Sequence, residues 1–385
     1  MKINLCVIMG GKSVEHEISV ITAVQAIQSL DKEKYEIIPL YITKKSEFYT
    51  SPAMCEIDCF KDIPALLQNS ERVAFVRKGD TVFLEGEKKG LKKPFCMNVD
   101  AAFPIVHGTN VEDGTLAGFL NLLDLPYCGC DVLSAANSMD KLITKDILKA
   151  KGIPVLDATD FYADRWAAER ENLLDLIEKN HRYPIIVKPV NLGSSVGVYK
   201  VKNREDLAAA IDDCFLLCSR VMIENAVENL REINCSVLGD VYEAAASPCE
   251  EPVGNDAILS YGDKYMSGQK GMSGQTRKLP ADLPEGQTGL IQKYAVGAFK
   301  ALGCAGVARV DFLTDAKTGE IYVNELNTIP GSLSFYLWEA AGLHYRELLD
   351  KIIALAFKRD RERKNLNFSF DTNILSGFSF GGLKK

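Results

Sequence analysis

The chain has 385 residues, and at roughly 100–200 residues per domain this length predicts two or three domains. Hydrophobic residues make up 47% and charged residues 25%, which is typical of a folded globular protein and excludes wholesale disorder, a collagen-like fibre and a coiled coil. The net charge of −7 argues against a general nucleic-acid binder, because binding to phosphate backbones needs a concentrated basic surface.

The N-terminus and the cysteines indicate the compartment. No apolar run approaches the roughly 18 residues that a membrane-spanning helix needs. Residues 1–9 form a short apolar stretch that leads into Gly10-Gly11 rather than into a cleavage site, so they are not a signal peptide. The 11 cysteines are scattered without a CxxC pair, which favours buried thiols over disulfides or zinc ligands. We therefore expect a cytoplasmic protein that binds no membrane.

Residues 1–129 predict an N-terminal α/β domain. The expected elements are a strand over 1–9, a helix over 14–30 that Ser13 caps, and strands over 35–42 and 101–106. Strand, helix and strand in this order are typical of a Rossmann-like parallel sheet. Residues 46–98 are irregular, with weak strands over 73–76 and 82–84, and are interpreted as an insertion that decorates this domain.

Residues 130–225 and 226–360 predict two α+β domains, and 361–385 a loose tail. The expected helices are 140–151, 165–180, 204–217, 285–302 and 344–362, and the expected strands are 158–162, 185–188, 197–201, 221–224, 232–248 as a hairpin, 306–314 and 320–327. The long stretch 248–275 has little periodicity, and a loop of this length in a compact domain is usually functional or disordered.

The predicted hairpin over 306–327 carries the clearest chemical pattern. Because side chains alternate along a strand, Arg309 and Asp311 share one face, and Glu325 and Asn327 share one face of the returning strand. Two carboxylates and an amide oxygen are hard ligands that suit Mg²⁺, which also binds nucleotide phosphates. The alternative is a solvated strand face with a surface salt bridge.

A second pattern begins where a predicted apolar strand ends at Lys188. The turn over 189–197 exposes backbone N–H groups and the hydroxyls of Ser194 and Ser195, and donor-rich loops of this kind can close over phosphates. It is not a Walker loop, because the GxxxxGK[ST] order is absent. The alternative is an ordinary β-hairpin turn.

A third pattern places Glu15 after the glycine turn that ends the first predicted strand. Open α/β sheets bind ligands at the carboxyl ends of their strands, so Glu15 could hold a substrate ammonium there. A carboxylate that only complements the helix dipole is the alternative.

Four further residues each have a functional and a structural interpretation. Lys141 starts a predicted helix and is either a ligand-binding or a surface lysine. Glu224 ends a strand between two domains and either accepts from an adenine amino group or is exposed. Tyr265, beside Lys264 in the long loop, contacts a ligand or anchors the loop. His107 is more simply a satisfied polar histidine beside a turn than a catalytic group.

Seven co-linear motifs give the chain a family resemblance. In order they are GGKSVEHEIS, HGTNVEDGTLAGF, SMDKLITK, IIVKPVNLGSSVGV, DKY, GVARVDF and NELNTIPG. From about residue 3 to 355 the chain resembles the ATP-grasp superfamily and, within it, the D-alanine–D-alanine ligases. Other ATP-grasp enzymes share the lysines and the metal hairpin, but not the glycine–serine–glutamate opening or the lysine–tyrosine loop.

The resemblance implies a role for each motif. ATP would lie between the central and C-terminal sheets, contacted by Lys141, Lys188, Glu224, Val227, Glu232, Lys264 and Asn324, with two Mg²⁺ or Mn²⁺ ions on Asp311, Glu325 and Asn327. The first D-alanine would place its ammonium on Glu15 and become an acyl phosphate, which the amine of the second would attack. Arg309 and the Gly331 backbone N–H would stabilise the oxyanion. Ser194 and Tyr265 would link to Glu15 and hold a lid over 248–275 closed. The product would serve peptidoglycan synthesis.

The chain departs from the family pattern near the second substrate. Val111 and Ala117 stand where a glycine and a glutamine are usual, and the stretch after Gly331 is shorter than usual, so we assign the second carboxylate to Ser334. D-serine or D-lactate as second substrate is an alternative, although the lysine–tyrosine pair favours an amine over D-lactate. A nucleotide-binding regulator without turnover is a further alternative, which the complete hairpin set argues against. We expect a homodimer.

Overall fold

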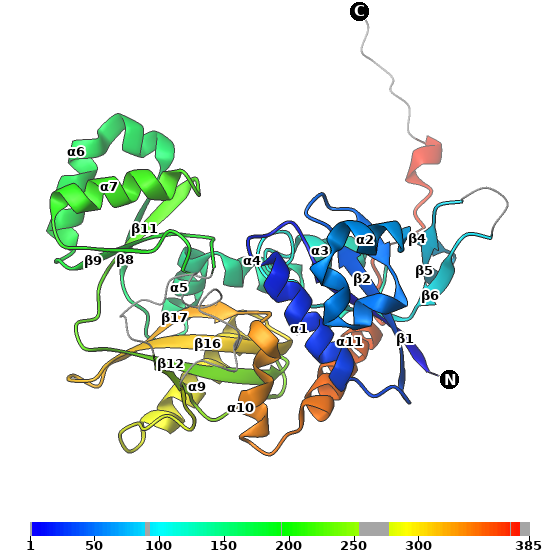
Figure 1. Cartoon of the computed structure of the whole chain (residues 1–385). Coiled ribbons are helices and arrows are strands. Elements are labelled where there is room, and N and C mark those ends of the chain that lie inside the picture. The colour runs from blue at the N-terminus through cyan, green and yellow to red at the C-terminus, as the bar shows by residue number, and fades with distance from the viewer. Residues whose placement is uncertain (1, 89–92, 194, 254–276, 370, 378–385) are drawn as a thin grey trace, which may run out of the picture.

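A computed structural model describes residues 2–88, 93–193, 195–253, 277–369 and 371–377. They form one seven-stranded sheet, two four-stranded sheets and a two-stranded ribbon. Figure 1 shows the first sheet in the blue N-terminal lobe, the second in the green lobe and the third between them in green, yellow and orange.

The N-terminal lobe is built on a mixed sheet with strand order β6-β5-β4-β3-β2-β1-β7. Its elements are β1 (Ile3–Gly10), α1 (His16–Ser29), β2 (Tyr35–Ile42), β3 (Phe48–Thr50), η1 (Pro52–Cys55), η2 (Ile57–Lys61), α2 (Ile63–Gln68), β4 (Glu71–Lys78), β5 (Thr81–Gly86), β6 (Cys96–Val99), β7 (Ala101–Pro104) and α3 (Thr115–Leu122). β1 pairs in parallel with β2 and β7, as the sequence predicts, and every other pair is antiparallel.

Two expectations for this lobe are wrong. Residues 46–98 do not decorate the sheet but extend it, because β3 pairs with β2 and leads on to β4, β5 and β6. Ser13 does not cap α1, because the helix begins at His16 and the residue before it is Glu15. The Ser13 hydroxyl instead accepts a hydrogen bond from the Glu15 backbone N–H at 3.1 Å.

The central lobe has a four-stranded antiparallel sheet with order β10-β9-β11-β8. Its elements are α4 (Val132–Met139), α5 (Lys141–Ala150), β8 (Ala158–Tyr162), α6 (Ala163–Asn180), β9 (Ile185–Pro189), β10 (Tyr199–Val201), α7 (Arg204–Phe215) and β11 (Arg220–Asn225). Figure 1 shows α6 and α7 together on the outer side of this sheet. Apolar residues of α6, α7 and the strands form one buried cluster, which leaves the opposite side of the sheet available for a ligand.

The C-terminal lobe has a second antiparallel sheet with order β13-β12-β16-β17. Its elements are β12 (Leu230–Gly239), β13 (Ala244–Ala246), β14 (Glu251–Pro252), β15 (Arg277–Lys278), α9 (Gln287–Ala301), β16 (Gly306–Asp315) and β17 (Ile321–Asn327). The chain then continues through η4 (Gly331–Ser334), α10 (Phe335–Glu339), α11 (Tyr345–Lys364) and η5 (Ile374–Gly377). Across the described part of the chain, none of the helices has both the length and the apolar character needed to cross a bilayer.

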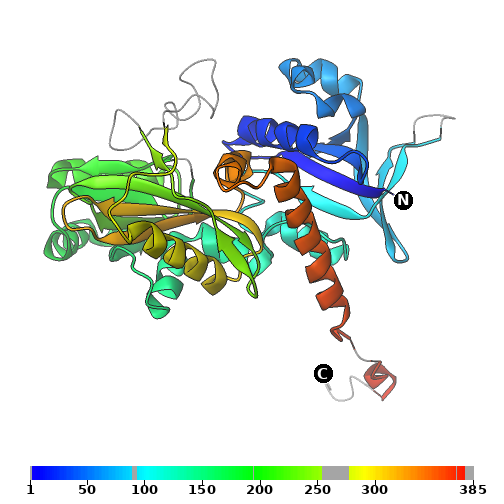
Figure 2. The same ribbon diagram turned by 90° about the horizontal axis from the view of Figure 1, so that it is seen from below.

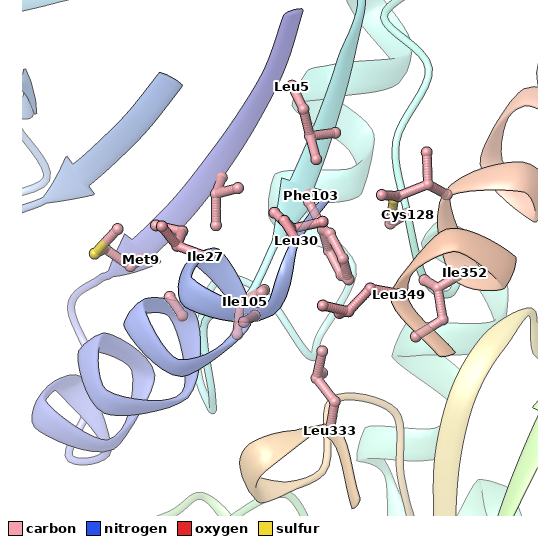
Figure 3. Close-up of a cluster of buried hydrophobic side chains, with 14 of the residues drawn as sticks. Leu5, Met9, Ile27, Leu30, Phe103, Ile105, Cys128, Leu333, Leu349 and Ile352 are labelled. Carbon is pink, nitrogen blue, oxygen red and sulfur yellow. The ribbon is translucent and has the colours of Figure 1, made fainter. Parts of the chain in front are cut away.

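One core joins the first and last parts of the chain. Figure 3 shows Leu333 of η4 pointing toward Leu349 of α11, which in turn faces Phe103 of β7. Figure 2 shows α11 leaving the C-terminal lobe and running along the N-terminal one. Because η4 directly follows the β16–β17 hairpin, this core holds the hairpin and the end of β1 in a fixed relation.

Candidate active site

Two adjoining cavities bring together residues from all three lobes. The acidic cavity, of about 190 Å³, has six acidic side chains among its lining residues: Glu15, Glu112, Glu232, Glu250, Asp311 and Glu325. The lysine cavity, of about 110 Å³, is lined by Lys141, Lys188, Lys200, Glu224, Val227 and Glu232, among others. Asn324 and Glu325 line both cavities, so the two meet at β17.

The lysine cavity is built around a buried carboxylate. Glu224, near the end of β11, is 1% exposed and lies 2.6 Å from the ammonium of Lys188 and 2.5 Å from that of Lys145. Burial opposes its ionisation, but the charges of the two lysines outweigh burial and lower the pKa of Glu224. Two buried cations around one anion leave an excess positive charge. A group of this kind suits an anionic ligand such as a phosphate. The alternative that Glu224 is exposed is therefore excluded.

Lys141 is held in the same wall by a capped helix. Asp140 caps α5 by accepting from the backbone N–H groups of Leu142 and Ile143, each at 3.0 Å. This start directs the Lys141 ammonium to the Leu192 carbonyl at 2.6 Å and to Glu325 at 3.4 Å. Its side chain is 10% exposed, so the surface-lysine interpretation is wrong.

The β16–β17 hairpin brings its four polar residues together as predicted. Arg309 pairs with Asn327 and Asp311 with Glu325 across the two strands, and the register shifts directly after Asp311. The Arg309 guanidinium donates to both oxygens of Asp311, at 2.6 and 2.8 Å, and Asn327 donates to Asp311 at 2.9 Å. Burial opposes the positive charge, but the Asp311 carboxylate outweighs burial and raises the pKa of Arg309.

The donor set of this hairpin fits a nucleotide-linked Mg²⁺. Asp311, Glu325 and Asn327 offer two carboxylates and an amide oxygen at the border of the two cavities. Among the described residues, no group of three or more histidine, cysteine, aspartate or glutamate side chains could hold a metal by itself. Phosphate oxygens would have to complete the coordination, which is how Mg²⁺ binds in many nucleotide sites.

Glu15 lies in the N-terminal wall of the acidic cavity, where three segments meet. It precedes α1 and is 8% exposed. A Cβ atom on Gly108 would lie 3.0 Å from the Glu15 Oε2 atom, and one on Gly193 would lie 3.6 Å from it. Gly108 also has a φ of +83°, so a side chain there would be strained as well as crowded. The turn after Lys188 therefore approaches Glu15 closely.

Comparison with known proteins decides the family. The model for the D-ala D-ala ligase N-terminus matches residues 4–130, and the model for the C-terminus matches residues 147–354. A D-alanine–D-alanine ligase of Thermosipho melanesiensis is 39% identical over 375 residues, or 97% of this chain and 98% of the relative. The chain belongs to the D-alanine–D-alanine ligase family.

Solved structures confirm the ATP-grasp fold of this ligase-family chain. The VanG D-Ala:D-Ser ligase of Enterococcus faecalis has a TM-score of 0.77 and 31% identity, covering 92% of this chain and 100% of that one. A D-alanine–D-alanine ligase of Bacillus anthracis complexed with ATP has a TM-score of 0.65 and 28% identity, covering 94% and 99%. The expected sandwich of two α+β lobes is thus the fold of an ATP-dependent ligase family.

The two residues predicted after β17 of this ligase separate in the structure. Gly331, predicted for the oxyanion, lines the acidic cavity, as does Tyr336. Ser334 is fully buried, does not line the cavity, and its hydroxyl has no hydrogen-bond partner among the described residues. Ser332, Leu333 and Ser334 all have a φ of +51°, which turns this stretch toward the core. The assignment of the second carboxylate to Ser334 therefore finds no support here.

Other predicted ligase residues lie outside the described residues. They are Ser194, Lys264 and Tyr265, and with them most of the predicted lid over 248–275.

His107 is buried, and its Nε2 atom lies 3.1 Å from the Thr22 hydroxyl oxygen, as expected for a satisfied histidine. It also lines the acidic cavity.

Glu112 is a site residue that sequence reasoning missed. Its two carboxylate oxygens accept from the backbone N–H groups of Gly108 at 2.7 Å and Ile329 at 3.3 Å, so it joins the N-terminal lobe to the residues after β17. Burial, and then the charge of Glu15, raise the pKa of Glu112 to about 8. Its place in the motif HGTNVEDG, directly after a buried strand, was the available signal.

Lys145 was missed for a different reason. It stands one helical turn after Lys141 on α5, a spacing that also occurs on exposed helix faces. Only the fold shows that its side chain is 6% exposed and paired with Glu224. Burial is the largest influence on the Lys145 ammonium and lowers its pKa, with Glu224 opposing the shift.

Proposed function

We propose that the chain joins two molecules of D-alanine to D-alanyl-D-alanine at the expense of ATP, for peptidoglycan synthesis. The observation that carries this proposal is the junction of the two cavities at β17. There a cationic pocket, suited to phosphates, opens into an acidic one that ends at Glu15.

The nucleotide would occupy the lysine cavity. Lys141 and Lys188 line it and supply positive charge for the phosphates, while Glu224, Val227 and Glu232 lie around the adenine and ribose. Lys188 also donates to the Asn324 side chain at 3.0 Å, which directs its ammonium toward the border with the acidic cavity. The family's use of ATP and the ATP complex of the Bacillus anthracis relative support this assignment.

In the first step a carboxylate oxygen of the first D-alanine attacks the γ-phosphorus of ATP. The bond between that phosphorus and the β–γ bridging oxygen breaks, and ADP leaves. Glu15 holds the ammonium of this D-alanine. Asn324 and Glu325 line both cavities, so a γ-phosphate beside them would lie next to the carboxylate of the D-alanine. Holding the carboxylate and the γ-phosphate side by side supplies much of the rate enhancement.

In the second step the amine of the other D-alanine attacks the acyl-phosphate carbonyl. The nitrogen enters as an ammonium and releases one proton before the attack. The carbon–oxygen bond to phosphate then breaks, and the leaving phosphate takes up the second proton as the amide N–H forms. Arg309 and the backbone N–H of Gly331 stabilise the oxyanion that forms, and each donor of this kind is typically worth about 3 kcal/mol.

The finer roles rest on the donor set and on family resemblance. Two Mg²⁺ or Mn²⁺ ions held by Asp311, Glu325 and Asn327 would offset the charge of the transferred phosphoryl group. Lys264, near the γ-phosphate, and Ser194 and Tyr265, linked to Glu15, stay predictions, as do the homodimer and the cytoplasmic location.

The test is ADP release measured with D-alanine, D-serine, D-lactate and L-alanine, singly and in pairs, with the product identified by mass. D-alanine alone should suffice and give the dipeptide. A product only with D-alanine and D-serine together would favour the second candidate, which the likeness to the VanG D-Ala:D-Ser ligase supports. Tight ATP binding with no turnover on any pair would contradict the proposal and favour a regulator.

A further inference from the structure

Arg277 is a cation of the acidic cavity that has no role in the two proposed reaction steps. It lies on β15, which pairs with β14 so that Arg277 is opposite Pro252 and Lys278 is opposite Glu251. The two neighbours have different surroundings. The Arg277 side chain is 20% exposed and lines the acidic cavity, whereas Lys278 is 57% exposed and lies 3.5 Å from Glu251.

Tyr336 and Glu250 both contact the guanidinium of Arg277. It lies over the ring of Tyr336, with 4.1 Å between the guanidinium carbon and the ring centroid, and 3.5 Å from the Oε2 atom of Glu250. The other Glu250 oxygen accepts from the Tyr336 hydroxyl at 2.7 Å and from the Asn234 amide at 3.1 Å. Glu250 is 3% exposed. Arg277, Glu250 and Tyr336 therefore form a preorganised cluster in the cavity wall.

The acidic lining of this cavity favours a cationic side chain as the partner of the second substrate's carboxylate. The amino acid that attacks the acyl phosphate brings its own carboxylate into a cavity that six acidic side chains already line, of which Glu112 keeps its proton at neutral pH. Among the described lining residues, the basic side chains are His107, Arg277 and Arg309. Burial lowers the pKa of His107, and Arg309 forms a bidentate pair with Asp311.

We infer that Arg277, held on the ring of Tyr336, binds the carboxylate of the second substrate and selects an acceptor with a free α-carboxylate. This inference rests on the proposed ligase function. A guanidinium has five N–H donors in a planar fork, so it can bind Glu250 and a substrate carboxylate at the same time. Arg309 lines the same cavity, and Glu250 and Tyr336 lie close enough to raise its pKa. Because Arg309 is proposed to stabilise the oxyanion, Arg277 lies near the reacting carbonyl.

The experiment lets D-alanine and D-alaninamide compete as acceptors for the acyl phosphate of D-alanine. The two products, dipeptide and dipeptide amide, are counted by mass spectrometry. Their ratio is set after the acyl phosphate forms, so it does not depend on the first step or on the fraction of folded enzyme. The variants are Arg277→Ala and Arg277→Lys, with Lys278→Ala as the matched control on the adjacent, exposed position.

The unaltered chain should prefer D-alanine, and Arg277→Ala should reduce this preference roughly tenfold to a hundredfold, the effect of one lost charged hydrogen bond. Arg277→Lys should restore part of the preference, and Lys278→Ala should leave it unchanged. An unchanged ratio in Arg277→Ala would overturn the inference and leave the ligase function standing. If the unaltered chain makes no dipeptide from D-alanine, the proposed function fails, and the inference fails with it.

Discussion

Glu224 and its two lysines show how single residues prepare the nucleotide pocket. A buried carboxylate with one cation would be neutral and would hold that cation tightly. The second cation, Lys145, shares the carboxylate, so Lys188 can turn to a phosphate without leaving Glu224 unpaired. Lys145 is thus a positioning residue in this account, because it acts through Glu224 and Lys188.

Replacement of Lys145 should therefore weaken nucleotide binding without contacting the nucleotide. We expect Lys145→Met to raise the KM for ATP about tenfold, because Lys188 would then be held by Glu224 alone. Titration of ATP by calorimetry measures the same effect without turnover. Lys149→Met is the control, since Lys149 lies on the same helix but pairs with Asp157 at the surface. Equal ATP affinities in the two variants would remove the positioning role.

The raised pKa of Glu112 predicts a pH-dependent stability. The folded protein holds this proton up to about pH 8, whereas the unfolded chain releases it near the ordinary value of 4.5. As pH rises between these values, the unfolded state binds fewer protons than the folded state, so the free energy of unfolding falls.

Glu112→Gln removes this loss. The difference in unfolding free energy between the variant and the unaltered protein should therefore grow in favour of the variant, by a few kcal/mol, as the pH rises from about 5 to about 8. Urea unfolding of metal-free protein at both pH values measures the gain. Glu36→Gln, at an exposed position on β2, should show no such trend. A constant difference between Glu112→Gln and the unaltered protein at both pH values would contradict the assignment.

At the scale of elements, the β16–β17 hairpin is expected to carry the phosphoryl chemistry. Glu325→Ala should abolish ADP release at saturating Mg²⁺ while the circular dichroism spectrum stays unchanged, because a ligand at the border of both cavities is lost. Glu320→Ala is the control near the turn of the same hairpin, where the side chain is exposed. Wild-type activity in Glu325→Ala would remove the proposed metal site.

The short helix η4 should matter for stability as well as for the site. Leu333 is 2% exposed and belongs to the core that joins α1, β7 and α11. Leu333→Ala should cost about 2–4 kcal/mol in unfolding free energy and should lower activity, because Gly331 is held by the same turn. Leu122→Ala, at a position that is 85% exposed, should change neither quantity. Urea unfolding and ADP release of both variants provide the comparison.

Elements with strong alternation could be predicted from the sequence with their bounds. The weak strands over 73–76 and 82–84 fall within β4 and β5, but their place in the sheet could not be predicted. The strand over 35–42 and the strand over 158–162 agree with β2 and β8 residue for residue, because apolar periodicity and flanking turns mark both ends. The segment 46–98 could not be placed, since its short strands become a sheet only by pairing with β2 and with one another. Such non-local pairing leaves little trace in the local sequence.

At the scale of the whole molecule, the same limit separates the predicted from the missed site residues. Arg309, Asp311 and Glu325 were predictable because one hairpin contains them and strand alternation gives their faces. Glu112 and Arg277 were not, because their partners Ile329 and Tyr336 are distant in sequence and the core of α11 with the N-terminal sheet brings them together.

The whole-molecule claim is that two cavities, one for phosphates and one for amino acids, exchange a phosphoryl group at their border. The most direct measurement uses D-alanine with both carboxylate oxygens replaced by ¹⁸O. Attack of that carboxylate on ATP and later release of phosphate should transfer one ¹⁸O atom to inorganic phosphate for each dipeptide formed. Dipeptide formation with wholly unlabelled phosphate would contradict the acyl-phosphate route and, with it, the proposed junction of the two cavities.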